Sequence, residues 1–243
     1  MDQEKQSEMA REEGVSGGGE GDSVVEFTAE RDICSLAEFA TWIAQLRDEV
    51  SETLWFRGQA DATWDLDPTI LRPPWDARMP KEEHQLRRVF ELRAPAFADR
   101  IPESEFERLG IMQHHGFPTR LLDWTGGALI ALYFALRARP TKKETSAAVW
   151  ILCPSHMNIA RAKAVGGKSK GALWMAHNFE RTQSEAPHLL RKAPVATLLS
   201  HTTDRAQAQR SSFTWHPERR AIEALQEGSD QRFLWKLRIP ATT

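Results

Sequence analysis

The sequence predicts an α+β protein, built as a single domain in which helices flank one mixed or antiparallel sheet. Length and composition are the first reason, because 243 residues of which 41% are hydrophobic suit one large domain with a sizeable core. Second, segments with helical spacing and short runs typical of strands occur in the same chain. Third, these segments do not alternate regularly, which disfavours a doubly wound parallel sheet.

The charge of the chain limits its classes of partner. The formal net charge is -2, so there is no general electrostatic attraction for nucleic acid or membranes. The first 22 residues hold seven acidic and two basic residues, together with three consecutive glycines. We therefore expect a disordered acidic tail over residues 1–23 and a folded domain over residues 24–243. The tail is either a solvated extension or a contact for a basic protein partner.

Cysteine usage and hydropathy predict the compartment. The two cysteines, Cys34 and Cys153, form neither a disulfide framework nor a metal-binding pattern, and we expect both to be buried thiols in a reducing cytosol. The N-terminal residues lack the apolar core of a signal peptide. The longest mostly apolar run, residues 128–136, is too short to cross a bilayer and is typical of a buried helix. The sequence therefore predicts a cytoplasmic protein without a membrane segment.

Local patterns predict the elements of the first half of the chain. A capping box at Ser35 and Glu38 precedes a helix over 36–47, and a second one at Ser104 and Glu107 precedes a helix over 105–115. Between them lie a strand over 53–57 that Gly58 ends, a short strand over 64–66, and a helix over 80–98.

The second half is predicted less completely. We expect a buried helix over 126–138 with Thr125 as its cap, followed by a strand over 147–152. Residues 154–200 suggest two or three short helices, with a mobile glycine-rich loop near residues 166–171. Two further strands are expected over 213–215 and 233–237.

The first candidate functional segment is residues 55–59, where Arg57 ends an apolar strand and Gly58 and Gln59 follow. A guanidinium forks onto phosphate or carboxylate oxygens with two parallel hydrogen bonds. Glycine lets a ligand or another backbone approach closely. The structural alternative is an ion pair of Arg57, with Asp123 or with a helix C-terminus.

The second candidate segment is residues 113–125, which carry many polar side chains on a connection between two helices. His114 and His115 are candidates for general acid–base groups or neutral hydrogen-bonding groups. Adjacent side chains on a helix point about 100° apart, so the two histidines are poorly placed to share a metal ion, and we predict no metal site. Asp123 would orient a histidine or pair with Arg120 or Arg57; alternatively, it belongs to a helix N-terminus. The expected ligand-binding residues here are Gln113, Thr119, Arg120 and Thr125.

The third candidate segment is residues 205–214. Arg205 and Gln209 lie on one face whether the segment is extended or helical, and they form a polar patch before a strand. The alternative is an ordinary surface turn.

Together the three segments resemble the FRG domain family, over about residues 35 to 238. The first part of the resemblance is Trp55-Phe56-Arg57-Gly58 with Trp64, Leu66, Pro68 and Arg72. The central part is the run 113–125, continued by Ala128, Ala131, Leu132, Tyr133, Phe134 and Ala135, and the last part is Arg205, Gln209 and Phe213. The resemblance implies a bacterial or phage origin, with some members in defence or toxin contexts. It also implies a further helix and strand after residue 239.

Three functions fit these residues. The first is an enzyme on a nucleotide-type substrate, in which Arg57 holds phosphate, His114 or His115 acts as acid or base, and Asp123 or Gln209 positions the reacting group. A strand arginine followed by glycine is analogous to the first motif of ADP-ribosyltransferases, which makes NAD a candidate cofactor, although Gln207-Ala208-Gln209 lacks the catalytic glutamate. The second is a nucleotide- or partner-binding module without turnover. The third is a metal-independent RNA-cleaving toxin using the histidines with Arg57.

Overall fold

The computed structural model describes residues 27–76, 81–94, 102–137, 145–167, 171, 176–185, 187–190, 192–198 and 211–241. The predicted acidic tail over residues 1–23 lies outside these residues, as do residues 168–170 of the predicted glycine-rich loop.

The described part of the chain folds around one seven-stranded sheet of order β1-β7-β4-β2-β3-β6-β5. All neighbouring strands are antiparallel except β1 and β7, which are parallel, so the sheet is mixed, as the sequence predicted. The strands are β1 (Glu30–Asp32), β2 (Trp55–Gln59), β3 (Leu121–Thr125), β4 (Ala147–Leu152), β5 (Val195–Thr197), β6 (Ser211–Trp215) and β7 (Leu234–Ile239).

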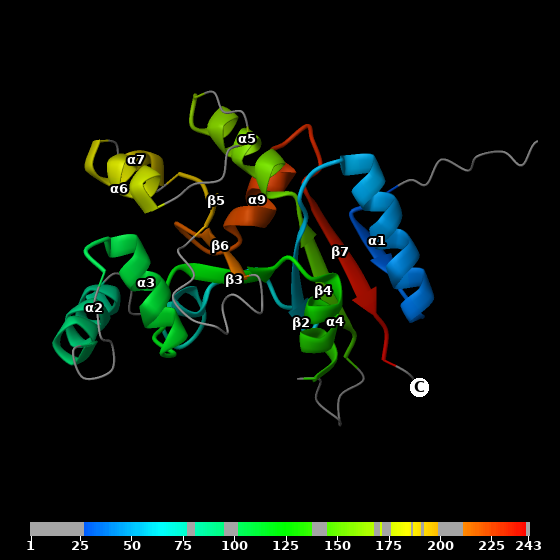
Figure 1. Cartoon of the computed structure of the whole chain (residues 1–243), viewed down its shortest axis with the longest axis horizontal. Helices are drawn as coiled ribbons and strands as arrows, with labels where there is room; N and C mark the ends of the chain where they lie inside the picture. The colour runs from blue at the N-terminus through cyan, green and yellow to red at the C-terminus, as the bar shows by residue number, and fades with distance from the viewer. Residues whose placement is uncertain are drawn as a thin grey trace, which may run out of the picture.

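Most of the helices lie in two groups along the sheet, and Figure 1 shows α1 and α4 beside β2, β4 and β7, and α2, α3, α6 and α7 beyond the other end of β3. Their bounds are α1 (Leu36–Val50), η1 (Thr69–Leu71), α2 (Lys81–Arg93), α3 (Glu105–His114), α4 (Ala128–Arg137), α5 (Pro154–Ala164), α6 (Ala176–Glu185), α7 (Pro187–Leu190) and α9 (Ala221–Glu227).

The sheet changes direction between β2 and β3. In Figure 1, β4 and β7 run steeply, whereas β3 lies nearly horizontal. The register explains the change, because β2 pairs with β4 along its whole length but with β3 only at Phe56 and Thr125. Two clusters of buried side chains follow from it: one around Phe56, Trp42 and Ile151, and a smaller one around Phe90, Phe106 and Trp215.

The helix starts predicted from the two capping boxes are confirmed. The Ser35 hydroxyl accepts from the Glu38 N–H at 3.1 Å, and the Glu38 carboxylate accepts from the Cys34 N–H at 3.0 Å. These contacts satisfy backbone donors that have no partner within the helix, so α1 begins where the sequence predicted. The Ser104 hydroxyl accepts from the Glu107 N–H in the same way at the start of α3.

Several predicted boundaries were wrong. Strand β2 continues through Gly58 to Gln59, and residues 64–66 form no strand. The helix expected from residue 126 begins at Ala128, because residues 121–125 pair with β6 as a strand. This helix is buried only on one side, where Ala131 and Ala135 lie. Strands β1 and β5 and helix α9 are short, and the sequence patterns did not reveal them.

The cysteine prediction was half right: Cys153 is buried, but Cys34 is exposed. Within the described residues, no helix combines the length and the apolar character that a membrane crossing requires.

Gly58 makes the closest approach between a helix and the sheet. A Cβ atom placed on Gly58 would lie 1.9 Å from the Ala131 carbonyl oxygen and 2.6 Å from the Ala135 nitrogen of α4. The Arg47 guanidinium of α1 lies over the Phe56 ring, 5.6 Å from its centroid, so α1 contacts the Phe56 side chain. Side chains alternate along a strand, so Phe56 and Gly58 lie on the same face of β2. Strand alternation then directs the Arg57 side chain to the opposite face.

We predict that Gly58→Ala lowers the free energy of unfolding by at least about 3 kcal/mol, because backbone atoms cannot move aside as a flexible side chain would. Urea unfolding measures the change. Gly228→Ala is the matched control, since its Cβ would meet nothing nearer than 3.7 Å, and we expect a change within about 0.5 kcal/mol there. Equal stability of the two variants would contradict the close packing of α4 on β2.

Candidate functional site

Arg57 lies at the junction where β2 and β3 part. Its Nη1 atom donates to the Asp123 backbone carbonyl at 2.7 Å. The side chain therefore replaces the backbone pairing that the two strands lack beyond Phe56. The structural alternative from the sequence, an ion pair between Arg57 and the Asp123 carboxylate, does not form within the described residues, because the contact is made to the carbonyl. Arg57 as a residue is partly exposed, but its Nε atom is buried and has no hydrogen-bond partner in the described part.

Arg72 brings a second positive charge to this junction. The loop after β2 returns through η1, where the Ile70 N–H donates to the Thr119 carbonyl. Arg72 follows, and its Nε atom donates to the Asp67 carbonyl at 2.6 Å. The Asp67 carboxylate is itself occupied, because it accepts from the Arg219 side chain at 2.9 Å and from the Arg220 N–H at 2.6 Å.

The two arginines are close enough to affect each other's ionisation. Burial lowers the pKa of Arg57 to about 10; the Asp123 charge opposes this shift and the Arg72 charge adds to it. Burial also lowers the pKa of Arg72, and the charges of Asp67 and Asp123 oppose that shift. Both groups stay protonated near neutral pH. In the described part of the chain neither forms an ion pair within 4.0 Å, so two desolvated cations face one exposed carboxylate, that of Asp123.

His216 is the third group of the junction. It is fully buried, and its Nε2 atom lies 2.8 Å from the Thr214 hydroxyl, which accepts from the Trp124 indole N–H at 2.9 Å. Burial and the charges of Arg57 and Arg72 lower the pKa of His216 to about 3, so the ring is neutral at neutral pH. Its Nδ1 atom is buried without a hydrogen-bond partner among the described residues. The junction thus holds two arginines, a neutral histidine and an exposed carboxylate.

Gly58 and Gln59, both expected to bind a ligand, have structural contacts instead. Gly58 admits the backbone of α4, the second of the two uses of glycine foreseen from the sequence. The Gln59 amide donates to the Asp65 carbonyl at 3.1 Å and accepts from the Trp150 indole N–H at 2.7 Å. The Lys236 ammonium group lies over the same Trp150 ring, 4.9 Å from its centroid. Gln59 therefore fixes the loop after β2.

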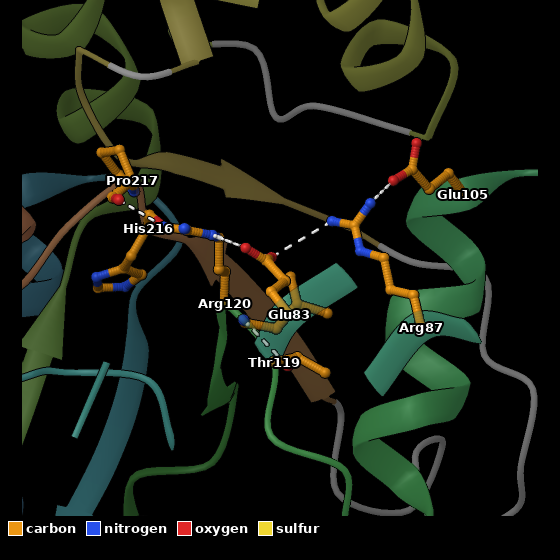
Figure 2. A network of polar contacts seen from close by, with 8 residues as sticks. Glu83, Arg87, Glu105, Thr119, Arg120, His216 and Pro217 are labelled. Atoms are coloured by element: carbon orange, nitrogen blue, oxygen red, sulfur yellow. Dashed lines mark hydrogen bonds and ion pairs between the residues drawn. The ribbon is translucent and has the colours of Figure 1, made fainter. Parts of the chain in front are cut away.

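Arg120 belongs to a separate polar network, which Figure 2 shows. Its Nε atom donates to both carboxylate oxygens of Glu83, at 3.1 and 2.9 Å, and its Nη1 atom donates to the Pro217 carbonyl at 2.5 Å. Its guanidinium also lies 5.9 Å from the centroid of the Trp215 ring. Glu83 and the Pro217 carbonyl thus occupy the Arg120 guanidinium, which ties α2 to the end of β6.

The remaining polar residues of the central segment stabilise its turn and the start of α4. The buried Thr119 hydroxyl donates to the Gln113 side-chain oxygen and accepts from the Leu121 N–H at 3.2 Å. The Thr125 hydroxyl accepts from the Gly127 N–H at 3.2 Å, just before α4 begins.

His114 and His115 lie at the C-terminal end of α3 and are both exposed. Their rings meet edge to face, with centroids 5.2 Å apart. Arg57's hydrogen bond is to the Asp123 carbonyl, and neither His114 nor His115 is among its contacts in the described part. The structure therefore brings together Arg57 and Asp123 from the predicted site, but not the two histidines.

Arg205 and Gln209 lie outside the described residues. No group of three histidine, cysteine, aspartate or glutamate side chains suited to a metal ion occurs within the part of the chain that is described.

Sequence reasoning missed Arg72, Thr214 and His216 as members of the site. Arg72 was noted only as part of the family pattern, and His216 had no informative spacing. The alternation Thr214-Trp215-His216 at the end of strand β6 was the available signal, since it places two polar side chains on one face.

Comparison with known proteins agrees with the central motifs. The FRG domain model matches residues 52–144, which supports the resemblance to the FRG domain family. This match includes Arg57, Arg72 and Asp123, whereas Thr214 and His216 come from outside it. No curated protein matches the chain, and no solved structure matches it.

We predict that His216 makes the fold sensitive to acid. The folded-state pKa of about 3 lies below the ordinary value of 6.5, so below pH 6.5 the unfolded chain binds a proton that the folded chain excludes. The free energy of unfolding therefore falls as the pH falls from 6.5 towards 3. Between about pH 7.5 and about pH 5.5, this histidine should remove about 1.4 kcal/mol of stability.

Urea unfolding of the wild type and His216→Gln at both pH values measures this contribution. The variant should lose about 1.4 kcal/mol less than the wild type over the same interval. Exposed His188→Gln is the control and should keep the wild-type dependence. If His216→Gln also keeps it, His216 does not exclude the proton.

Proposed function

We propose that this protein is an enzyme that acts on a nucleotide-type, phosphate-bearing substrate held at Arg57 and Arg72. One observation carries the proposal: both guanidinium groups donate only to backbone carbonyls in the described contacts, although burial has removed much of their hydration. A buried charge is costly unless a partner compensates it. An anionic ligand would supply that compensation.

The free donors suit phosphate. Arg57 uses Nη1 and its Nε is buried, which leaves Nη2, and Arg72 uses Nε, which leaves Nη1 and Nη2, as far as the described contacts show. The Arg72 pair has the spacing that binds two oxygens of one phosphate group, and the Arg57 Nη2 atom can add a further hydrogen bond. These donors favour a ligand with two phosphate groups or one phosphate with several free oxygens. NAD and nucleoside di- and triphosphates have this chemistry, and the analogy with ADP-ribosyltransferases favours NAD.

Asp123 is the candidate for the acid–base group. Its carboxylate is exposed, acts on the charges of both arginines, and takes no part in a hydrogen bond or ion pair within the described residues. A carboxylate in this position can accept a proton from a hydroxyl or water next to a bound phosphate.

A binding module without turnover is the second candidate. The observation in its favour is that Gln113, Thr119, Arg120 and Thr125 of the central segment all have structural contacts. The junction then offers a charge to hold a ligand but few groups to transform it.

We predict that Arg57→Gln and Arg72→Gln each weaken ligand binding about 10-fold or more, because each removes charge-assisted hydrogen bonds worth about 1.5–3 kcal/mol. Thermal unfolding with inorganic pyrophosphate, NAD, ATP, a cyclic nucleotide and a short RNA identifies the ligand. A compound at about 100 times its Kd should add about 2.7 kcal/mol of stability. Isothermal titration then gives the affinities of the variants.

Arg137→Gln is the control, since this exposed arginine lies on α4, across the sheet from the Arg57 side chain. It should bind like the wild type. A ligand bound equally well by all three variants would occupy another part of the molecule, and the proposal would fail.

Asp123→Asn separates the two candidate functions. It removes a negative charge near both arginines, so anion binding should be unchanged or tighter. If Asp123 is the acid–base group, turnover of the bound ligand should fall about 100-fold or more, measured by product release under saturating ligand. Full turnover in Asp123→Asn would exclude this role, and absence of turnover in the wild type with intact binding would favour the binding module.

A further inference from the structure

A groove lies between α2 and α3. Figure 1 shows these two helices on the side of the molecule away from β4 and β7. The groove encloses a volume of about 270 Å³. We propose that this groove is a second binding site, which takes a small anion with an apolar body. The proposal rests on this groove alone and does not depend on the function proposed for the sheet junction.

The two helices line the groove with one face each. Helix α2 contributes Arg87, Arg88 and Glu91, and helix α3 contributes Arg108, Leu109 and Met112. Spacings of three and four residues place such side chains together on a helix. The groove is therefore built from two regular helices, of which α3 begins at the Ser104 cap.

The floor of the groove is apolar. Phe90, Leu109 and Met112 line it and are 1%, 2% and 3% exposed. The Phe90 ring is held in place by an edge-to-face contact with Phe117, with centroids 5.7 Å apart. Small-molecule sites typically combine such a floor with a few polar groups and have volumes of about 300–1,000 Å³. The volume of this groove, about 270 Å³, lies just below that range, so the groove would take a ligand no larger than one or two fused rings.

The rim of the groove favours an anion. Arg87 already pairs with Glu83 and with Glu105, which also lines the groove. Arg108 donates from Nη1 to the Pro102 and Glu103 carbonyls, at 3.1 and 2.7 Å. These contacts hold the Arg108 side chain in place but leave its charge without a carboxylate among the described residues.

Arg88 is the remaining cation of the rim. It is exposed and has no ion pair in the described part of the chain. Arg88 and Arg108 together face one unpaired carboxylate, that of Glu91. The unpaired groups of the rim therefore have a net positive charge, and an anion would lie between the two guanidinium groups.

Arg87 is unsuitable for testing the groove. Figure 2 shows that Arg87 joins Glu105 to Glu83, and that Glu83 binds Arg120. A substitution at Arg87 would disturb the contacts that tie α2 to the end of β6. Arg88 lies outside this network, so its replacement changes the rim without disturbing the fold.

The test is calorimetric titration of the full chain with two probes of the same body and opposite charge, 1-naphthalenesulfonate and 1-naphthylmethylammonium. The wild type should bind the sulfonate at least about 10-fold more tightly than the ammonium. Arg88→Glu should reverse this preference, because it changes the rim charge by two units at one position.

Arg93→Glu is the matched control: it makes the same charge change at an exposed arginine of α2 that does not line the groove, and it should retain the wild-type preference. Arg57→Gln should also bind the sulfonate normally; loss of binding in this variant would place the anion at the sheet junction instead. The proposal is overturned if the wild type binds neither probe, binds both equally, or if Arg93→Glu and Arg88→Glu behave alike.

Discussion

The single register pair between β2 and β3, Phe56 opposite Thr125, is the constraint on which the rest of the structure depends. Because the two strands part beyond it, the sheet can change direction and serve two separate clusters of buried side chains. The parting also leaves the β3 backbone without β2 as a partner, and Arg57 meets this need through the Asp123 carbonyl. The candidate site is therefore a consequence of how the sheet is joined.

The close approach of α4 to β2 determines on which face of the sheet Arg57 lies. Gly58 admits the Ala131 carbonyl on one face, and its neighbour Arg57 necessarily points to the other. An arginine there loses hydration, as its lowered pKa reflects, and this loss opposes folding unless something compensates it. Gly58 is required by the packing of α4 on β2, whereas the packing does not require a charged side chain at Arg57. The packing explains the glycine, and the charge of Arg57 is the feature on which the proposed anion site rests.

The sequence predicted the parts that local interactions determine. Helix α1 begins and strand β4 lies where expected, because a cap and an apolar run lie within the segments themselves, although α1 extends three residues beyond its predicted end. The site could be predicted only in part, since its members Arg57, Arg72 and His216 come from distant segments and meet through the sheet register. The contact of Arg120 with Glu83, 37 residues apart, is equally invisible to local patterns. Strand register and the path of a long loop depend on the whole fold, and a single sequence contains no local signal for them.

The arginines of this chain differ in which groups compensate their charge. Arg120 has a carboxylate at 2.9 Å and a carbonyl at 2.5 Å, which is the full complement expected of a structural arginine. Arg57 and Arg72 have carbonyls but, among the described residues, no carboxylate within 4.0 Å. Since the same fold supplies a carboxylate to Arg120, its lack at the junction is not a limit of the architecture. A site that holds its cations with neutral oxygens keeps their charge available, and this is what binding an anion requires.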